Sequence, residues 1–310
     1  MNTRDFDPVQ LGSIELFCKA AELRGFSAAA IAMGVTPAAV SRSITRLEKR
    51  LGVKLFARTT RQINLTDDGQ LYYAHCKQAL EQIRDAERAL SGQQTLPSGV
   101  LRISAPTTYG HYRLMPLLPK FAALYPDIQL DVSLSNKNID FVDEGFDLAI
   151  RLGALGDSGL VARKLEDATL GVFASPAYLR AKGAPATLAD LQQHACIAFT
   201  LPSTGRAFPW RLKTGTPPLM TGQGDFNFDG PIKIRDDVLA CVSLAASGGG
   251  LCQTFHFVVA KAVQRGELEE VLQDHAGCTR SFSVLYPHNR QLSARVRVFV
   301  EYLVQAVQDT

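Results

Sequence analysis

The chain has 310 residues, of which 46% are hydrophobic and 20% are charged. This composition excludes a fibrous repeat and wholesale disorder. Domains usually hold about 100 to 200 residues, so the length predicts two unequal domains. The longest apolar stretches, such as residues 238–246, are far shorter than the roughly 20 residues of a membrane span, and residues 1–10 lack the apolar region of a signal peptide. We therefore expect a soluble, cytoplasmic protein with no membrane partner.

The cysteines are scattered and form no C-x-x-C pair, which argues against a structural zinc site and against a secreted disulfide framework. We expect no metal and no cofactor, and most of the cysteines to be small buried residues. A redox switch made of Cys241 and Cys252 is the alternative. The six cysteines are Cys18, Cys76, Cys196, Cys241, Cys252 and Cys278.

The net charge is confined to the first part of the chain. Residues 1–92 hold 13 Lys and Arg and 10 Asp and Glu, which accounts for the whole formal charge of +3. Within this part, residues 36–65 carry seven basic side chains and one acidic side chain, Glu48. Such a concentration of positive charge suits a polyanionic partner.

Residues 11–65 predict three helices followed by two short strands. Apolar residues between Leu11 and Ala21 recur at helical spacing, and Gly25 supplies a stop. Ser27 is expected to cap a short second helix, and Thr36 to cap a third helix that has proline in its first turn. The third helix is expected to face inward with Val40, Ile44, Leu47 and Leu51.

The outer face of the third helix begins with small residues and continues with basic ones. Small residues let a helix N-terminus enter the major groove, and arginines can bind phosphates or guanine. Residues 53–65 predict a wing with a basic turn. A merely solvated face, or a surface for protein contacts, is the alternative. The predicted DNA contacts are Thr36, Pro37, Ala38, Ser41, Arg42, Thr45, Arg46, Lys49, Arg58, Thr59, Thr60 and Arg61.

A long helix is predicted over residues 66–91, with Thr66 as its cap and Asp67 and Asp68 in its first turn. Small and apolar residues recur along it at spacings of three and four, which is typical of a helix that pairs with another. Packing against the N-terminal domain is the alternative. The predicted seam is Tyr72, Cys76, Ala79, Ile83, Ala86 and Leu90. Residues 92–99 have the composition of a hinge.

From Val100 onward, short β-rich runs alternate with helical patterns, which predicts an α/β domain. Strands are expected in VLRIS, IQLDVSL, DLAIRLG, LVARKL, LGVFAS, CIAFT, PIKIRD and FSVLY. Helical patterns occur in HYRLMPLLPKFAALY and NIDFVDEG, and at residues 176–181, 188–193, 237–247 and 292–307.

Residues 29–69, AAIAMGVTPAAVSRSITRLEKRLGVKLFARTTRQINLTDDG, resemble the winged helix-turn-helix of LysR-type transcriptional regulators. The order of the later elements and residues 283–303, SVLYPHNRQLSARVRVFVEYL, are similar to the same family. The resemblance implies a winged helix-turn-helix at 1–65, a linker and dimerisation helix at 66–91, a hinge at 92–99 and an α/β effector-binding domain at 100–310. That domain would have a two-subdomain fold like the type 2 periplasmic binding proteins. Subdomain I would hold about 100–166 and 269–310, and subdomain II about 167–268, with crossings near Asp167 and Leu268.

The resemblance also implies a ligand in the cleft between the subdomains. Its contact positions fall at Thr107, Thr108, Ser135, Asn136, Phe199 and Thr200. The two threonines are expected at a helix start, where anions bind readily, although simple capping is the alternative. Arg151 either neutralises a carboxylate of the ligand or pairs with a neighbouring acid. Asp236 and Asp237 are expected to cap a helix rather than to hold a metal.

These features predict a DNA-binding regulator that senses a small, anionic metabolite and is not an enzyme. Its expected partners are double-stranded promoter DNA, a small organic acid or other metabolite, a second copy of itself in a homodimer or homotetramer, and RNA polymerase. Two alternatives remain open. In the first, the protein binds DNA and its C-terminal domain serves only to assemble subunits. In the second, the protein is an enzyme in which Cys252 is the nucleophile and His256 the base. The run GGGLCQTFHFVV departs from the family, in which many members have a proline after this glycine-rich turn, and leaves the shape around Gln253 and Thr254 undefined.

Overall fold

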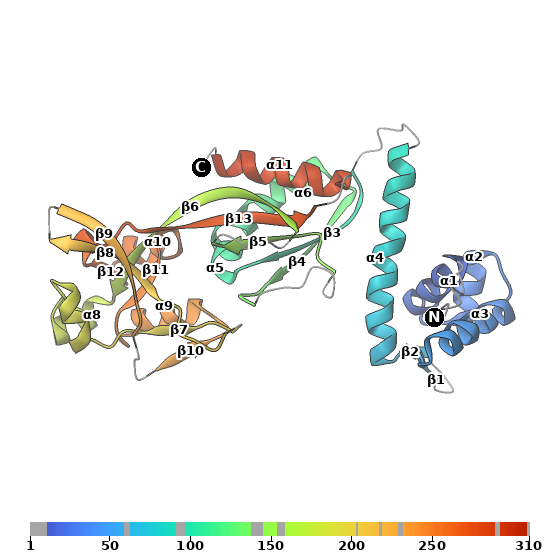
Figure 1. Cartoon of the computed structure of the whole chain (residues 1–310), viewed down its shortest axis with the longest axis horizontal. Coiled ribbons are helices and arrows are strands. Elements are labelled where there is room, and N and C mark those ends of the chain that lie inside the picture. The colour runs from blue at the N-terminus through green and yellow to red at the C-terminus, as the bar shows by residue number, and fades with distance from the viewer. Residues whose placement is uncertain are drawn as a thin grey trace, which may run out of the picture. The chain divides into compact units, whose positions relative to one another are not determined.

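The computed structural model describes residues 11–58, 63–90, 97–137, 145–153, 159–202, 204–216, 219–228, 232–288 and 292–308. They belong to two compact units, Met1–Thr95 and Leu96–Thr310 (Figure 1). The predicted combination of a helical, winged N-terminal part and an α/β C-terminal part is confirmed. Each unit has its own hydrophobic core.

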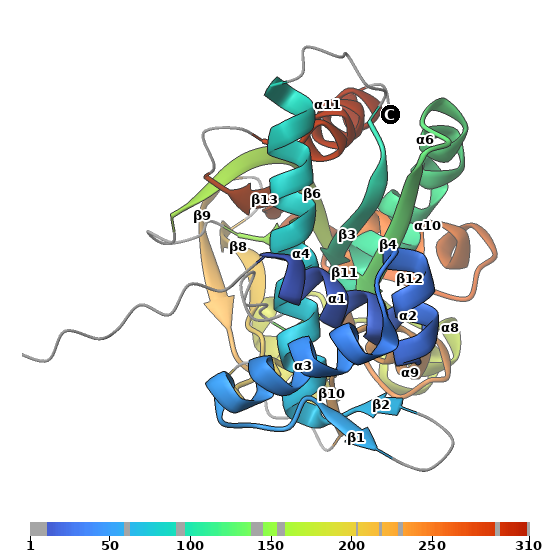
Figure 2. The ribbon, with the colours of Figure 1, turned by 90° about the vertical axis from the view of Figure 1, so that its right-hand side faces the viewer.

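The first unit is a three-helix bundle with a two-stranded hairpin and one long helix. Its elements are α1 (Leu11–Glu22), α2 (Phe26–Met33), α3 (Pro37–Leu51), β1 (Phe56–Arg58), β2 (Ile63–Leu65) and α4 (Asp67–Leu90). Phe17, Ala30, Val40, Ile44 and Leu55 are fully buried at its centre, as the helical spacing predicts. Strands β1 and β2 pair antiparallel. Figure 2 shows α3 leading through a short loop into β1.

The start of α2 differs from the expectation that Ser27 caps it. Gly25 is the N-cap residue, in extended conformation and without a side-chain hydrogen bond, and the helix begins at Phe26. The ring of Phe26 packs edge-to-face on that of Phe56, with 5.5 Å between centroids. The packing of this ring brings Phe26 into the first turn, so the helix starts two residues earlier than a cap at Ser27 predicts.

Helix α4 is fixed to the first unit at its start. Thr66 accepts a hydrogen bond from the Gly69 amide at 3.0 Å and donates one to the Lys54 carbonyl oxygen at 2.5 Å. Gly69 lies directly against the backbone of Leu55, where a Cβ would overlap the carbonyl oxygen. The cap predicted at Thr66 is therefore also the joint between the wing and the long helix.

The second unit is built on a seven-stranded sheet with the order β11-β6-β13-β5-β3-β4, and β12 also pairs with β6. The strands are β3 (Gly99–Ala105), β4 (Ile128–Leu134), β5 (Leu148–Leu152), β6 (Leu160–Ala174), β11 (Cys252–Phe255), β12 (Glu269–Val271) and β13 (Thr279–Pro287). Strand β3 is parallel to β4 and β5, whereas β13 is antiparallel to β5 and β6. This arrangement is that of an α/β domain with a mixed sheet.

Strand β6 is one continuous strand where the sequence predicts two, LVARKL and LGVFAS. Its first part, to Thr169, pairs with β13, and its last residues, Leu170–Ala174, pair with β11 and β12. The chain returns along β13, which begins at Thr279. The return crossing predicted near Leu268 is therefore wrong, because Glu269–Val271 still pairs with the far end of β6.

The remaining strands lie in two small sheets. Strand β7 (Ala198–Thr200) is parallel to β10 (Lys233–Arg235), and β8 (Trp210–Thr216) forms an antiparallel hairpin with β9 (Leu219–Phe226). The sequence interpretation missed β8, β9, β11 and β12. The predicted helical run NIDFVDEG, residues 138–145, lies almost wholly outside the described residues.

Helical segments surround these sheets. They are α5 (Thr107–Tyr109), a π-helical turn (Gly110–Leu114), a 3₁₀ turn (Met115–Leu117), α6 (Leu118–Leu124), α8 (Pro176–Lys182), a second 3₁₀ helix (Leu188–Gln193), α9 (Leu239–Ala246), α10 (His256–Gln264), a third 3₁₀ turn (Gln273–His275) and α11 (Ala294–Gln308). Helix α11 lies along the large sheet (Figure 1). Its residues Phe299 and Leu303 are fully buried.

Candidate functional sites

The N-terminus of α3 is an exposed, well-capped helix start. Thr36 accepts a hydrogen bond from the Ala39 amide at 3.2 Å, and Pro37 occupies the first helical position. Thr36, Pro37 and Ala38 are exposed. A helix start built from such small side chains fits closely against a groove edge.

The predicted basic residues continue this surface along α3. Arg42, Thr45, Arg46 and Lys49 are exposed and Ser41 is half-buried. Thr45 donates its hydroxyl hydrogen to the Ser41 carbonyl oxygen at 2.8 Å, so this donor is already used within the helix. The structure thus brings the predicted α3 residues together on one face.

Glu48, on the buried side of α3, is an anchor that the sequence interpretation missed. Its side chain is 3% exposed and accepts hydrogen bonds from the amides of Leu55 and Phe56 at 3.0 and 3.3 Å, and from Lys54 Nζ at 2.7 Å. Burial opposes ionisation, but the Lys54 ammonium and the two amides hold the pKa of Glu48 below its usual range. The only acid of the basic segment therefore faces inward, and the exposed face keeps its positive charge.

The wing is described only in part. Arg58 ends strand β1, whereas Thr59, Thr60 and Arg61 lie outside the described residues. The wing contacts at these four positions stay predictions.

The residues of the predicted seam on α4 have two different environments. Cys76 is 5% exposed and belongs to the core of the first unit, where the ring of Tyr72 packs on Phe17 at 5.4 Å. The assignment of Cys76 to a helix pairing is therefore wrong, because its own domain covers it. Ala79 and Ile83 are exposed, and the side chains of Ala86 and Leu90 are outside the described set.

In the second unit, Asn136 bonds to Thr107, another predicted ligand contact, and to the segment before α9. Its Nδ2 donates to Thr107 Oγ1 and to the carbonyl oxygen of Asp236, both at 2.9 Å, and its Oδ1 accepts from the Thr107 amide at 3.2 Å. Thr107 begins α5, whereas Asp236 lies between β10 and α9, 100 residues after Asn136. The sequence analysis expected Asp236 to cap a helix, whereas here its backbone oxygen accepts the bond from Asn136.

Ser135 and Arg151 both bond to the last residues of strand β3. The Ser135 amide donates to the Ala105 carbonyl oxygen at 2.9 Å, and its hydroxyl accepts from the Lys137 amide at 3.2 Å. Arg151 donates through Nη2 to Ser104 Oγ at 2.7 Å. The structure thus holds the guanidinium against a neutral hydroxyl of β3.

Three other predicted contacts have buried side chains. Thr108 is 5% exposed, Thr200 is 6% exposed, and Phe199 is 9% exposed and part of the main core. Their roles as direct ligand contacts stay predictions. Their positions at strand and helix ends are as expected, but packing turns them inward.

The glycine-rich turn before β11 is now defined. The side chain of Gln253 forms paired hydrogen bonds with the backbone of Arg211, one to its carbonyl oxygen and one from its amide, both at 2.8 Å. Thr254 is buried. Gly250 has φ +140° and lies against the Ala195 carbonyl oxygen. Gln253 therefore ties β11 to the hairpin strand β8.

Cys252 and His256 are not arranged as a nucleophile and its base. Cys252 is fully buried on β11, and burial raises the pKa of its thiol. His256 bonds instead with Glu270 at 2.8 Å and with the Thr169 carbonyl oxygen at 3.2 Å. Cys241 is also buried, and its pKa is raised by burial to about 12.

The described residues contain neither a metal-site cluster nor a membrane-spanning helix. Within the described ranges, no cluster of three or more His, Cys, Asp or Glu side chains has the arrangement of a metal site. In the same part of the chain, no helix combines the length and the apolar character needed to span a bilayer. Asp237 accepts a hydrogen bond from the Leu239 amide at 2.9 Å, as expected of a residue at a helix start.

Two family models match the chain. The model described as bacterial regulatory helix-turn-helix protein, lysR family, covers residues 11–70. The model described as LysR substrate binding domain covers residues 94–308. Together they span the α3 face and the Thr107–Asn136 junction.

Individual proteins match over nearly the whole chain. An HTH-type transcriptional repressor of Pseudomonas aeruginosa (strain UCBPP-PA14) is 36% identical over 297 residues, covering 96% of this chain and 92% of the relative. The solved structure of CrgA, a LysR-type transcriptional regulator from Neisseria meningitidis, matches with a TM-score of 0.60 and 30% identity over 97% of this chain and 99% of that one. The full-length structure of the Vibrio cholerae virulence activator AphB matches with a TM-score of 0.60 and 25% identity, over 96% of this chain and 99% of that one.

Proposed function

Because the chain belongs to the LysR family of DNA-binding transcriptional regulators, we propose that its α3 face reads promoter DNA and that its second unit senses a small anionic metabolite. The observation that carries the proposal is the separation of the two surfaces. The exposed basic face of α3 belongs to the first unit, and the hydroxyl and amide junction at Thr107 and Asn136 belongs to the second.

The DNA contacts divide by position on the helix. Thr36, Pro37 and Ala38 let the start of α3 approach the base edges, and Arg42 follows one turn later on the same exposed face. Arginine at such a position donates to guanine in the major groove. Arg46 and Lys49 are exposed further along α3, and we assign them and the wing arginines to phosphates, which carry affinity but little sequence information.

Arg42→Ala is expected to weaken binding to the preferred site by about 1 to 3 kcal/mol and to reduce discrimination between sequences. Arg61→Ala, in the wing, is expected to weaken binding to all DNA sequences alike and to reduce the magnitude of the slope of log affinity against log salt concentration by about one. Fluorescence anisotropy with a selected duplex and a scrambled duplex at several salt concentrations measures both effects. Unchanged affinity and slope in both variants would contradict the assignment.

The sensing proposal rests on the Asn136 junction. Thr107 and Asn136 keep polar side chains half-buried where α5 begins, and Asn136 reaches the opposite segment at Asp236. A carboxylate that accepts from the Thr107 hydroxyl, the Asn136 amide and nearby backbone amides would replace these bonds. Ser135, next in the chain, and Arg151, beside Ser104, complete the proposed set. An organic acid is thus the proposed class of effector.

Thr107→Val is expected to weaken effector binding about tenfold or more, because a hydrogen bond to a charged ligand is lost while the side-chain shape is kept. The matched control is Thr279→Val, an exposed threonine at the start of β13. A thermal-shift screen of small organic acids identifies the ligand, and calorimetry on the full chain gives the affinities. Equal loss in both variants, or no loss in Thr107→Val, would place the effector elsewhere.

Self-association is proposed along the second half of α4. Ala79 and Ile83 are exposed there, and Ile83 is 38% exposed despite its size. A pair of such helices would present two α3 faces to a two-fold DNA site. Ile83→Lys is expected to weaken the dimer, whereas Ala74→Lys, at an exposed position off the seam, is not. Sedimentation at dilute concentration separates the two, and a wild-type assembly for Ile83→Lys would exclude this contact.

The proposal covers both activation and repression, since the relatives include a protein named as a repressor and one titled as an activator. Contact with RNA polymerase, a homodimeric or homotetrameric assembly and a cytoplasmic location beside the DNA belong to the same proposal. Enzymatic activity does not, because the relatives are named as regulators.

A further inference from the structure

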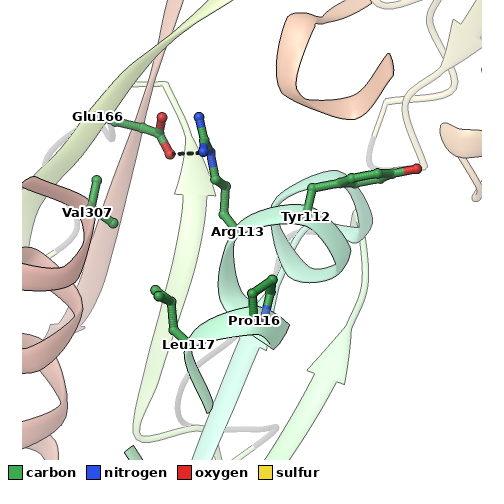
Figure 3. Close-up of a pocket in the computed structure, with 6 residues that line it drawn as sticks. All are labelled: Tyr112, Arg113, Pro116, Leu117, Glu166 and Val307. Carbon is green, nitrogen blue, oxygen red and sulfur yellow. Dashed lines mark ion pairs between the residues drawn. The ribbon is translucent and has the colours of Figure 1, made fainter. Parts of the chain in front are cut away.

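A hollow that shares no residue with the proposed effector site lies beside the π-helical turn (Figure 3). Its volume is about 180 Å³. An engineered apolar cavity of about 150 Å³ is known to bind benzene, so this hollow has room for a molecule of one ring. It is lined by Tyr112, Arg113, Pro116, Leu117, Glu166 and Val307.

One end of the hollow carries the ion pair of Arg113 and Glu166. Arg113 Nε lies 3.3 Å from Glu166 Oε1, as the dashed line in Figure 3 shows. Both atoms are buried, and among the described residues neither makes a hydrogen bond of good geometry. The two side chains keep 31% and 18% of their surface exposed, so a guest in the hollow can reach them. The guanidinium also packs over the Phe257 ring at 4.8 Å, which fixes its plane.

The other walls are apolar. Leu117 and Pro116 lie opposite the ion pair, Val307 comes from α11 and Tyr112 from the π-helical turn (Figure 3). The lining carries one positive and one negative group, so its net charge is zero. A charged guest would therefore leave an uncompensated charge in a partly buried site, which is costly.

We propose that this hollow is a second ligand site for a small uncharged molecule with one ring and one hydroxyl group. The hydroxyl oxygen accepts a hydrogen bond from Arg113, and its hydrogen is donated to the carboxylate of Glu166. The ring packs against Leu117, Pro116 and Val307. A single neutral group thereby bonds to both members of the ion pair through the parts of their side chains that are exposed.

Two of the segments that line the hollow, the strand β6 and the helical segment after Thr107, continue into other parts of the second unit. Glu166 pairs with Phe282 where the register of β6 and β13 shifts, and the next residue, Asp167, accepts a hydrogen bond from Ser281 at 2.6 Å. Arg113 lies in the helical segment that begins at Thr107. An occupant therefore touches both the strand that crosses between the subdomains and the segment that carries the proposed effector contact.

The proposal is tested with phenol, toluene, benzoate and benzylammonium, which share one ring but differ in the polar group. Calorimetry on the full chain is expected to show phenol binding about tenfold or more tighter than the other three, because only phenol supplies a neutral donor and acceptor. Absence of phenol binding, or benzoate or toluene binding as tightly as phenol, would overturn the assigned chemistry.

Two tryptophan variants test the location. Val307→Trp fills the hollow and is expected to weaken phenol binding at least tenfold. Val263→Trp, at a 40% exposed valine on α10, is expected to leave it unchanged. Methyl NMR of the wild-type chain adds a readout that needs no variant, with phenol expected to shift the signals of Val307 and Leu117. Equal binding by both variants, or shifts confined to other methyl groups, would overturn the site.

Discussion

Glu48→Ala is expected to lower the free energy of unfolding of the first unit by about 2 to 4 kcal/mol, because it leaves two buried amides without an acceptor. These amides belong to Leu55 and Phe56, which are 0% and 4% exposed. They begin the wing, so the same change is expected to reduce DNA affinity although Glu48 touches no DNA. Urea unfolding followed by far-UV circular dichroism measures the loss.

Two controls separate this role from a general effect of losing an acid. Glu48→Gln keeps one acceptor oxygen and is expected to lose about half as much stability. Glu22→Ala, which breaks partly exposed ion pairs with Lys19 and Lys77, is expected to lose less than about 1 kcal/mol. The single tryptophan, Trp210, is 5% exposed and lies in the second unit. Its fluorescence reports the urea midpoint of that unit, which is expected to stay the same in these variants. Equal losses for Glu48→Ala and Glu22→Ala would remove the anchor role.

The same carboxylate predicts an acid limit for the first unit. Its folded pKa lies below the ordinary value of 4.5, so the unfolded state binds more protons between the two values. The stabilisation is complete above about pH 4.5 and is lost as the pH falls through the folded pKa. Glu48→Gln is expected to flatten this part of the stability profile.

Gly250→Ala is expected to destabilise the second unit by about 2 to 5 kcal/mol. Gly250 has φ +140°, where side chains are strained, and its Cβ would overlap the carbonyl oxygen of Ala195. That oxygen accepts the Leu251 amide at 2.9 Å, so relief of the overlap would break a contact that places β11. Trp210 packs in the same core cluster as Leu251, and its fluorescence in urea follows the change.

Gly266→Ala is the matched control for the backbone cost alone. Gly266 has φ +69°, and nothing lies within 4 Å of the position of its Cβ. It is expected to cost about 1 to 2 kcal/mol, the price of a left-handed backbone for alanine. If both variants lose equal stability, the overlap with Ala195 contributes nothing and the expectation for Gly250 is wrong.

The local signals in the sequence were sufficient for the elements that carry the DNA face. Thr36 and Pro37 placed the start of α3, the spacing of Val40 and Ile44 gave its buried side, and Thr66 placed the start of α4. Caps and periodicity act within one or two helical turns, so they are readable without knowing what packs against the helix.

The long strands, and the burial of individual side chains, were harder to predict from the sequence. The sequence interpretation divided β6 in two and missed the hairpin of β8 and β9, because the stability of a strand depends on partners elsewhere in the chain. It assigned Cys76 to a dimer seam and Thr108 to a ligand, and both are buried inside their own unit. A helical stripe shows that one face is covered but not by which neighbour.

The family resemblance, the positive segment at residues 36–65 and the start of α3 could be read from the amino-acid sequence, since charge and capping are properties of neighbouring residues. The folded chain was needed to show that Glu48 faces inward to hold the wing, that Asn136 meets a backbone oxygen 100 residues away, and that Arg113 and Glu166 line a hollow. These contacts join atoms of segments that are distant in the chain and meet only when the chain folds. Every residue has a backbone oxygen, so the type of residue does not indicate which one accepts such a bond.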